Sequence, residues 1–228
     1  SNALYDMWWH GGNRTAPYRH NMIGILTEAA SARLASPVFQ HQSELRGISR
    51  GLPEYAAGVN FSQPWPGGWW RLRDIVEYEL IATDALLTYA ARYREQILKN
   101  YLTMNREAIQ AGQQKPPYAF IVPLDQHDVP TAFRLLDILK MGGVDIHTAE
   151  TDFSVEGHTY PAGTPIIFCA QPYRNHILDL LQPQEYPERR QFPGGPAERP
   201  YDMAGWTLSY QMGVETIPVQ KPFHVEAK

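Results

Sequence analysis

Beyond Pro117, short apolar runs alternate with amphipathic stretches, and this alternation limits the possible folds more than any other feature of the sequence. Three of the runs have the length and apolar content of buried strands, namely 119–124, 144–147 and 165–170. Two stretches have helical spacing of their apolar residues, namely 129–140 and 173–181. Gly157, within 153–160, predicts a small hairpin between the second and third strands. Strands and helices in this order predict right-handed crossovers, and hence an α/β domain with a small flavodoxin-like parallel sheet over 116–228.

Residues 71–115 carry a helical pattern that links this domain to the chain before it. The apolar residues that recur in steps of three and four, and so share one helical face, are Leu86, Ala90, Tyr93, Ile97, Tyr101, Met104 and Ala108. A helix of about 40 residues would span about 60 Å, which suits a strut between two domains. We expect this linking helix to break near Gly112, because Pro116 and Pro117 follow.

The overall composition argues against several classes of protein. A hydrophobic content of 43% with 19% charged residues is typical of a globular protein. The net charge of −4, without any block of Lys or Arg, argues against nucleic acid as a partner. No apolar run approaches the roughly 20 residues of a membrane-spanning helix. Cys169 is the only cysteine, so one chain can form neither an internal disulfide nor a thiolate metal cluster.

An apolar run at 22–26 is followed almost at once by a carboxylate, Glu28. The run predicts a buried strand, and a glutamate just past such a strand is costly to bury unless it is paired or used in chemistry. Glu28 therefore either caps a turn and bonds backbone amides, or serves in a functional site. The preceding stretch, 8–20, is dense in cations, aromatics and glycines, as loops that carry function often are.

Residues 8–31, which include Trp8-Trp9-His10 and Leu26-Thr27-Glu28, resemble the last part of the zinc carboxypeptidase domain of bacterial carboxypeptidase A-like metallopeptidases. The resemblance continues through 60–74 and into the C-terminal region, so it covers most of the chain. It implies that Glu28 is the general base and acid that acts on a zinc-bound water during peptide-bond hydrolysis. The resemblance also implies that the terminal carboxylate of the peptide substrate is bound by Arg14, Tyr18 and Arg19, since a bidentate Arg suits a carboxylate.

The resemblance also bears on where the metal is held. Such peptidases bind zinc through two His and one Glu that precede the catalytic Glu in the chain. The one string of this kind, His147-Thr148-Ala149-Glu150, follows Glu28, so we interpret it as a chance match. We therefore expect the zinc ligands upstream of Leu4 in the full-length protein and no zinc in this fragment. The resemblance favours a periplasmic or secreted location.

These observations divide the chain into four parts. Ser1-Asn2-Ala3 match the remnant of a cleaved expression tag and are excluded from the native sequence. Residues 4–70 are expected to form the C-terminal part of a peptidase-like domain, 71–115 the linking helix, and 116–228 the α/β domain. The sequence leaves the oligomeric state open.

Three further features have alternative interpretations. The α/β domain also resembles class I glutamine amidotransferase-like domains, whose nucleophilic Cys needs small neighbours; Cys169 lacks them, which predicts a buried thiol. Residues 125–128 follow the first strand, where ligands bind in open sheets, although Asp128 as a helix N-cap is the simpler account. A tryptophan cluster predicts either stacking on a sugar or peptide or burial between the domains, and its members are Trp65, Trp69 and Trp70. The alternative function is a non-catalytic module that binds a ligand or a partner protein.

Overall fold

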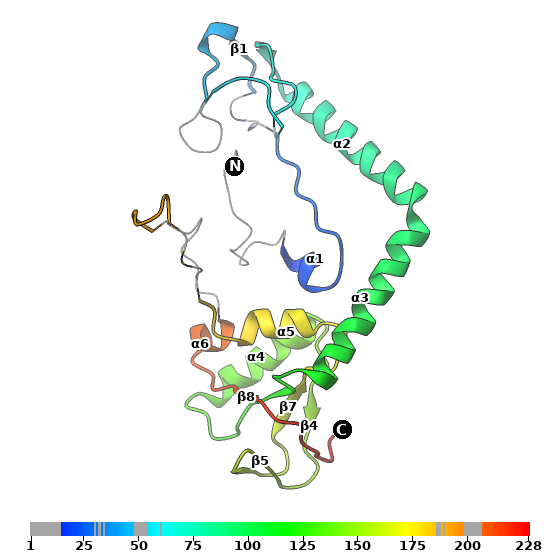
Figure 1. The fold of residues 1–228 in the computed structure, drawn as a ribbon, viewed down its shortest axis with the longest axis vertical. Coiled ribbons are helices and arrows are strands. Elements are labelled where there is room, and N and C mark those ends of the chain that lie inside the picture. The colour runs from blue at the N-terminus through cyan, green and yellow to red at the C-terminus, as the bar shows by residue number, and fades with distance from the viewer. Residues whose placement is uncertain are drawn as a thin grey trace. The chain divides into compact units, whose positions relative to one another are not determined.

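The computed structural model describes residues 15–29, 31, 33, 35–47, 54–59, 61–185, 188, 190–197 and 207–228. They form two compact units (Figure 1): the first contains the described residues of 25–97, and the second those of 15–24 and 98–228. The expected boundaries lay at 70 and 115, whereas the division falls at 97, inside a helix. In this described part, no helix has the length and apolar content needed to cross a membrane.

The first unit contains a two-stranded antiparallel sheet formed by β1 (Val38–Gln40) and β2 (Gly68–Trp70). A single turn of 3-10 helix, η2 (Gln42–Glu44), follows β1. Gly67 has φ of +89°, and a Cβ there would lie 2.7 Å from the carbonyl oxygen of Gln40, so only glycine fits this turn.

The expected linking helix is two helices, α2 (Leu72–Arg92) and α3 (Arg94–Gln114). The backbone N–H of Arg71 donates to Asp74 Oδ2 at 2.7 Å, which caps the start of α2. Tyr93, with φ of −108° and ψ of 19°, interrupts the helix at a position for which the sequence offered no Gly or Pro. The break expected near Gly112 is instead the end of α3, two residues later.

The second unit contains a four-stranded sheet in the order β4-β7-β3-β8, and every described pairing in it is antiparallel. The four strands are β3 (Ala119–Ile121), β4 (His147–Thr148), β7 (Pro165–Phe168) and β8 (Ile217–Val219). The protein is thus mixed helix and sheet, as an α/β class requires, but the expected parallel, flavodoxin-like sheet is wrong.

The antiparallel pairing follows from how the strands are connected. Helix α4 (Val129–Met141) joins β3 to β4. Only a hairpin, β5 (Phe153–Val155) and β6 (His158–Tyr160), lies between β4 and β7. Two strands joined without a crossover helix pair antiparallel, as β4 and β7 do. In the sheet, β7 lies between β4 and β3. The resulting β-α-β-β-α-β order is that of split βαβ, or ferredoxin-like, sheets.

The core of the second unit lies on both faces of the sheet. Alternate strand residues point to opposite faces: Phe120 and Val122 pack beneath the helices, whereas Ala119 and Ile121 face the hairpin. The helical face is covered by α4, α5 (Arg174–Leu181) and α6 (Leu208–Met212), which lie together in Figure 1. The strands predicted at 119–124 and 165–170 and the helix at 173–181 are confirmed with shorter bounds, the hairpin at 153–160 with the same bounds, and the helix at 129–140 with one residue more. The strand predicted at 144–147 is wrong except at its last residue, since β4 begins at His147.

The predicted buried strand at 22–26 is wrong. After the short helix α1 (Ala16–Arg19), residues 22–29 form no helix or strand. The apolar residues of the run, Met22, Ile23, Ile25 and Leu26, are each about half exposed. A strand is buried only where neighbouring strands or helices cover it, and no described strand pairs with this segment.

Candidate functional site

Described residues of the first unit line a cavity with a volume of about 620 Å³. Its lining residues are Thr27, Glu28, Ala29, Val38, Gln40, Leu45, Phe61, Gln63, Trp65, Trp70, Tyr78, Glu79 and Ala82. This volume lies within the range of about 300–1,000 Å³ that is usual for sites that bind small ligands. Glu28, the residue expected to act as base, therefore lies on the wall of a cavity large enough for a ligand.

Two carboxylates enter the cavity from different segments. Glu28 belongs to the irregular segment that follows the apolar run, and its side chain is exposed. Glu79 projects from α2, and Thr27 Oγ1 donates a hydrogen bond to its Oε2 at 2.6 Å. This bond fixes the Glu79 carboxylate and ties the segment that bears Glu28 to the helix.

Aromatic rings form much of the remaining wall. The ring centres of Trp65 and Trp70 are 5.7 Å apart in an edge-to-face arrangement, and Trp70 lies the same distance from Tyr78. The hydroxyl of Tyr55 donates to the Trp65 carbonyl oxygen at 2.8 Å, which supports the segment from behind. These ring contacts orient Trp65, Trp70 and Tyr78 relative to one another along the wall.

The tryptophan cluster proposed from the sequence therefore divides. Trp65 and Trp70 line the cavity, as a stacking site requires, whereas Trp69 does not. Trp69 instead packs edge-to-face on Phe39, and the guanidinium of Arg71 lies 5.1 Å from its ring centre. The register of β1 and β2 explains the split, since neighbouring strand residues point to opposite faces.

The four residues predicted for catalysis and substrate binding are found in different places. Glu28 belongs to the first unit, whereas Tyr18 and Arg19 lie on α1 in the second unit, and Arg14 lies outside the described residues. Arg19 Nη2 lies 2.8 Å from Oδ1 of Asp179, a buried carboxylate on α5. The guanidinium of Arg19 thus holds α1 on the second unit, a role the sequence did not predict.

Two histidines accompany this ion pair. Nδ1 of His20 lies 2.7 Å from the Ala16 carbonyl oxygen and Nε2 lies 2.8 Å from that of Gly142, so both bonds form only when the ring carries two protons. His176 lies 4.4 Å from His20 between ring centres, and its burial, followed by the charges of His20 and Arg19, lowers its pKa from 6.5 to about 4.

Cys169 is fully buried, as predicted. Burial raises the pKa of its thiol to about 12, against a smaller opposing effect of Arg174. A nucleophilic cysteine needs a thiolate near neutral pH, so the geometry does not support amidotransferase chemistry at this residue.

The segment 125–128 is engaged in structure. Asp128 caps α4, because its carboxylate accepts hydrogen bonds from the N–H of Thr131 at 3.1 Å and from its hydroxyl at 2.8 Å, and these bonds lower its pKa. Gln126 exchanges two hydrogen bonds with the backbone of Glu215. The N-cap interpretation of Asp128 is confirmed. The bonds of Gln126 hold the loop before β8 in place.

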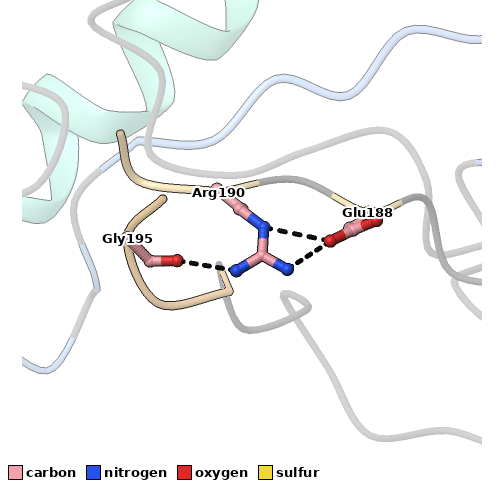
Figure 2. A network of polar contacts seen from close by, with 3 residues as sticks. All are labelled: Glu188, Arg190 and Gly195. Atoms are coloured by element: carbon pink, nitrogen blue, oxygen red, sulfur yellow. Dashed lines mark hydrogen bonds and ion pairs between the residues drawn. The ribbon is translucent and has the colours of Figure 1, made fainter. Parts of the chain in front are cut away.

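Two other polar clusters are local. Arg190 donates hydrogen bonds to the Glu188 carboxylate and to the carbonyl oxygen of Gly195 (Figure 2), the second at 2.9 Å, which closes the turn over 190–195. His147 in β4 packs its ring on Phe168.

Within the residues that the structure describes, no group of three or more His, Cys, Asp or Glu side chains could hold a metal ion.

Comparisons with known proteins found no matching family model, no matching curated protein and no matching solved structure. The geometry of the cavity is therefore the basis for assigning a function.

Proposed function

We propose that the chain is the C-terminal part of a zinc carboxypeptidase-like enzyme, in which Glu28 is the general base and acid of peptide-bond hydrolysis. The observation that carries the proposal is the position of Glu28 on the wall of the 620 Å³ cavity. Glu28 is exposed and borders the cavity, so its carboxylate is accessible to a ligand there.

The chemistry asked of Glu28 is proton transfer. Its carboxylate takes a proton from the attacking water as the water oxygen bonds to the peptide carbonyl carbon. The same proton then passes to the amide nitrogen as the C–N bond breaks, so Glu28 ends the cycle ionised, as it began. A carboxylate positioned in this way contributes about 10²- to 10⁴-fold to the rate.

Zinc is implied by the resemblance and not by the donor groups of this chain. The described side chains supply no set that fits the metal, so we derive no step through it. Zinc would polarise the scissile carbonyl, and the proposal assigns its ligands to polypeptide upstream of Leu4.

A non-catalytic ligand-binding module is the second candidate. The aromatic wall and the Thr27–Glu79 hydrogen bond favour it, because they shape the cavity without any contribution from Glu28. In this case Glu28 would affect ligand affinity and there would be no turnover to lose.

Replacing Glu28 by Gln in the natural full-length chain separates these candidates. We expect the turnover of peptides with a free C-terminus to fall by at least about 100-fold, with bound zinc unchanged in metal analysis. Glu77→Gln is the matched control, because Glu77 is an exposed α2 carboxylate outside the cavity. Turnover by Glu28→Gln within tenfold of the parent would exclude Glu28 as the base.

A further inference from the structure

The charges that the described residues place on the cavity wall all have one sign. Among the lining residues in the described part of the chain, only Glu28, Tyr78 and Glu79 can ionise, and none is Lys, Arg or His. Two nearby cations have partners outside the cavity lining: Arg71 lies over Trp69, and Arg73 Nε bonds Glu77 Oε1 at 2.7 Å. The two lining carboxylates therefore have no cationic partner among these residues.

The aromatic wall favours the same kind of ligand. The rings of Phe61, Trp65, Trp70 and Tyr78 all border the cavity. The face of an aromatic ring carries partial negative charge and attracts ammonium and guanidinium groups, most strongly for Trp. Aromatic walls with carboxylates and without basic groups discriminate against anionic ligands and favour organic cations.

We infer that this cavity binds an organic cation, namely an ammonium or guanidinium group on an aliphatic stem, as in the Lys or Arg side chain of a peptide. The choice of a peptide as the carrier rests on the proposed function, whereas recognition of the cation does not. The volume of about 620 Å³ accommodates such a side chain together with the adjoining peptide units.

Glu79 is the charge partner for the cation. Thr27 Oγ1 bonds its Oε2 at 2.6 Å, and no described residue donates to its Oε1, which can face the ligand. The Thr27 bond holds the carboxylate in place before the ligand arrives, which lowers the entropy cost of binding. Glu28, from the neighbouring position, adds a second negative charge.

The test compares ligands that differ by one charged group. Nα-acetyl-lysine N-methylamide and its norleucine analogue have the same stem, and only the first carries an ammonium. We expect calorimetric titration of the 228-residue chain to give at least about fivefold tighter binding of the lysine compound, with the arginine analogue behaving like lysine. The preference should weaken as salt is raised from 50 to 500 mM, since salt screens the carboxylates.

Substitutions in the cavity test whether the preference for lysine over norleucine arises there. Glu79→Gln should remove most of the lysine preference while retaining norleucine binding, and Glu77→Gln on the same helix should leave both unchanged. Trp65→Leu should weaken binding of both the lysine and the arginine compound, and circular dichroism checks that this variant is folded. Equal binding of lysine and norleucine, tighter binding of the glutamate analogue, or an unaltered preference in Glu79→Gln would overturn the inference.

The outcomes also separate this inference from the proposed function. A lysine preference lost in Glu79→Gln, together with normal turnover in Glu28→Gln, would support the cation site and refute the catalytic role of Glu28. Loss of turnover in Glu28→Gln without any preference for basic ligands would do the reverse.

Discussion

The two units of this protein differ most in what they bury. Within the described residues, every buried apolar side chain except Ala35 belongs to the second unit. There, the strands are covered on one face by three helices and on the other by a hairpin and the C-terminal segment. In the first unit, the 21-residue helix α2 has no buried residue at all.

This difference shows that apolar sequence does not by itself produce a core. Leu80, Ile81 and Leu87 on α2 are each more than half exposed, although similar residues on α4 are fully buried. Because ordering a residue costs about 1–2 kcal/mol of backbone entropy, a unit with so little burial is not stabilised by its described contacts alone. We infer that the first unit depends on contacts beyond them, whereas the second unit contains its own core.

The substitution expected to have the largest effect on stability is Gly112→Ala, in the second unit. A Cβ at Gly112 would lie 2.1 Å from the carbonyl oxygen of Cys169, at the end of β7. Helix propensity alone predicts a gain of about 1 kcal/mol, but the contact with backbone cannot relax easily. We expect the free energy of unfolding to fall by about 3 kcal/mol or more, measured by urea unfolding and by faster amide exchange in β3 and β7.

Gly58→Ala is the control in the first unit. A Cβ at Gly58 meets no atom within 4 Å, and the residue has no left-handed φ. We expect a change within about 0.5 kcal/mol. Equal effects of the two substitutions would show that α3 does not pack closely on the end of β7.

The next test compares the stability contributed by one ion pair in each unit, Arg19–Asp179 in the second and Arg73–Glu77 in the first. Arg19→Met should remove the Arg19 guanidinium from the Asp179 carboxylate, whose side chain is 8% exposed. We expect a loss of about 2 kcal/mol, partly restored by adding Asp179→Asn, since removing one partner of a buried ion pair is costly. Arg73→Met, whose pair with Glu77 is exposed on both sides, should cost less than about 0.5 kcal/mol. Similar losses in urea unfolding would contradict the distinction.

The parts of the fold that the sequence predicted are those whose partners lie within the same unit. The strand at 119–124 is buried because β7 and β8 flank it, and Gly157 turns the hairpin as its spacing indicated. The sheet order was missed although the sequence contained the clue. Residues 149–164 hold a hairpin and no helix, so they could not form a parallel crossover.

The candidate site was predicted less completely. Glu28 was identified, but as the end of a buried strand, because an apolar run was assumed to have neighbours that cover it. Glu79 was missed because the sequence does not distinguish it from Glu77, the other carboxylate two positions earlier in the same helical stretch. The contact of Glu79 with Thr27, 52 positions away, depends on tertiary structure that periodicity does not reveal.

A smaller effect than those of Gly112→Ala and Arg19→Met is expected at His176 in the second unit, whose pKa is lowered from 6.5 to about 4 by burial and by the neighbouring charges of His20 and Arg19. Between pH 6.5 and 4 the unfolded chain binds a proton at this position and the folded chain does not. Its contribution to stability is therefore complete above pH 6.5 and is lost as the pH falls toward 4. Because the ring is partly open to solvent, we expect a loss of about 1 kcal/mol over this window.

Carboxylates also titrate in acid, so the effect of His176 must be isolated by comparison with His176→Gln, which carries no ionisable group at this position. The difference in urea midpoint between the parent and this variant should stay constant from pH 8 to 7 and shift in favour of the variant from pH 6 to 4.5. A difference independent of pH would mean that the folded protein protonates His176 as readily as the unfolded chain. Burial of the His176 ring would then not oppose its protonation, and the contact of α1 with α5 would tolerate a further charge beside the Arg19–Asp179 ion pair.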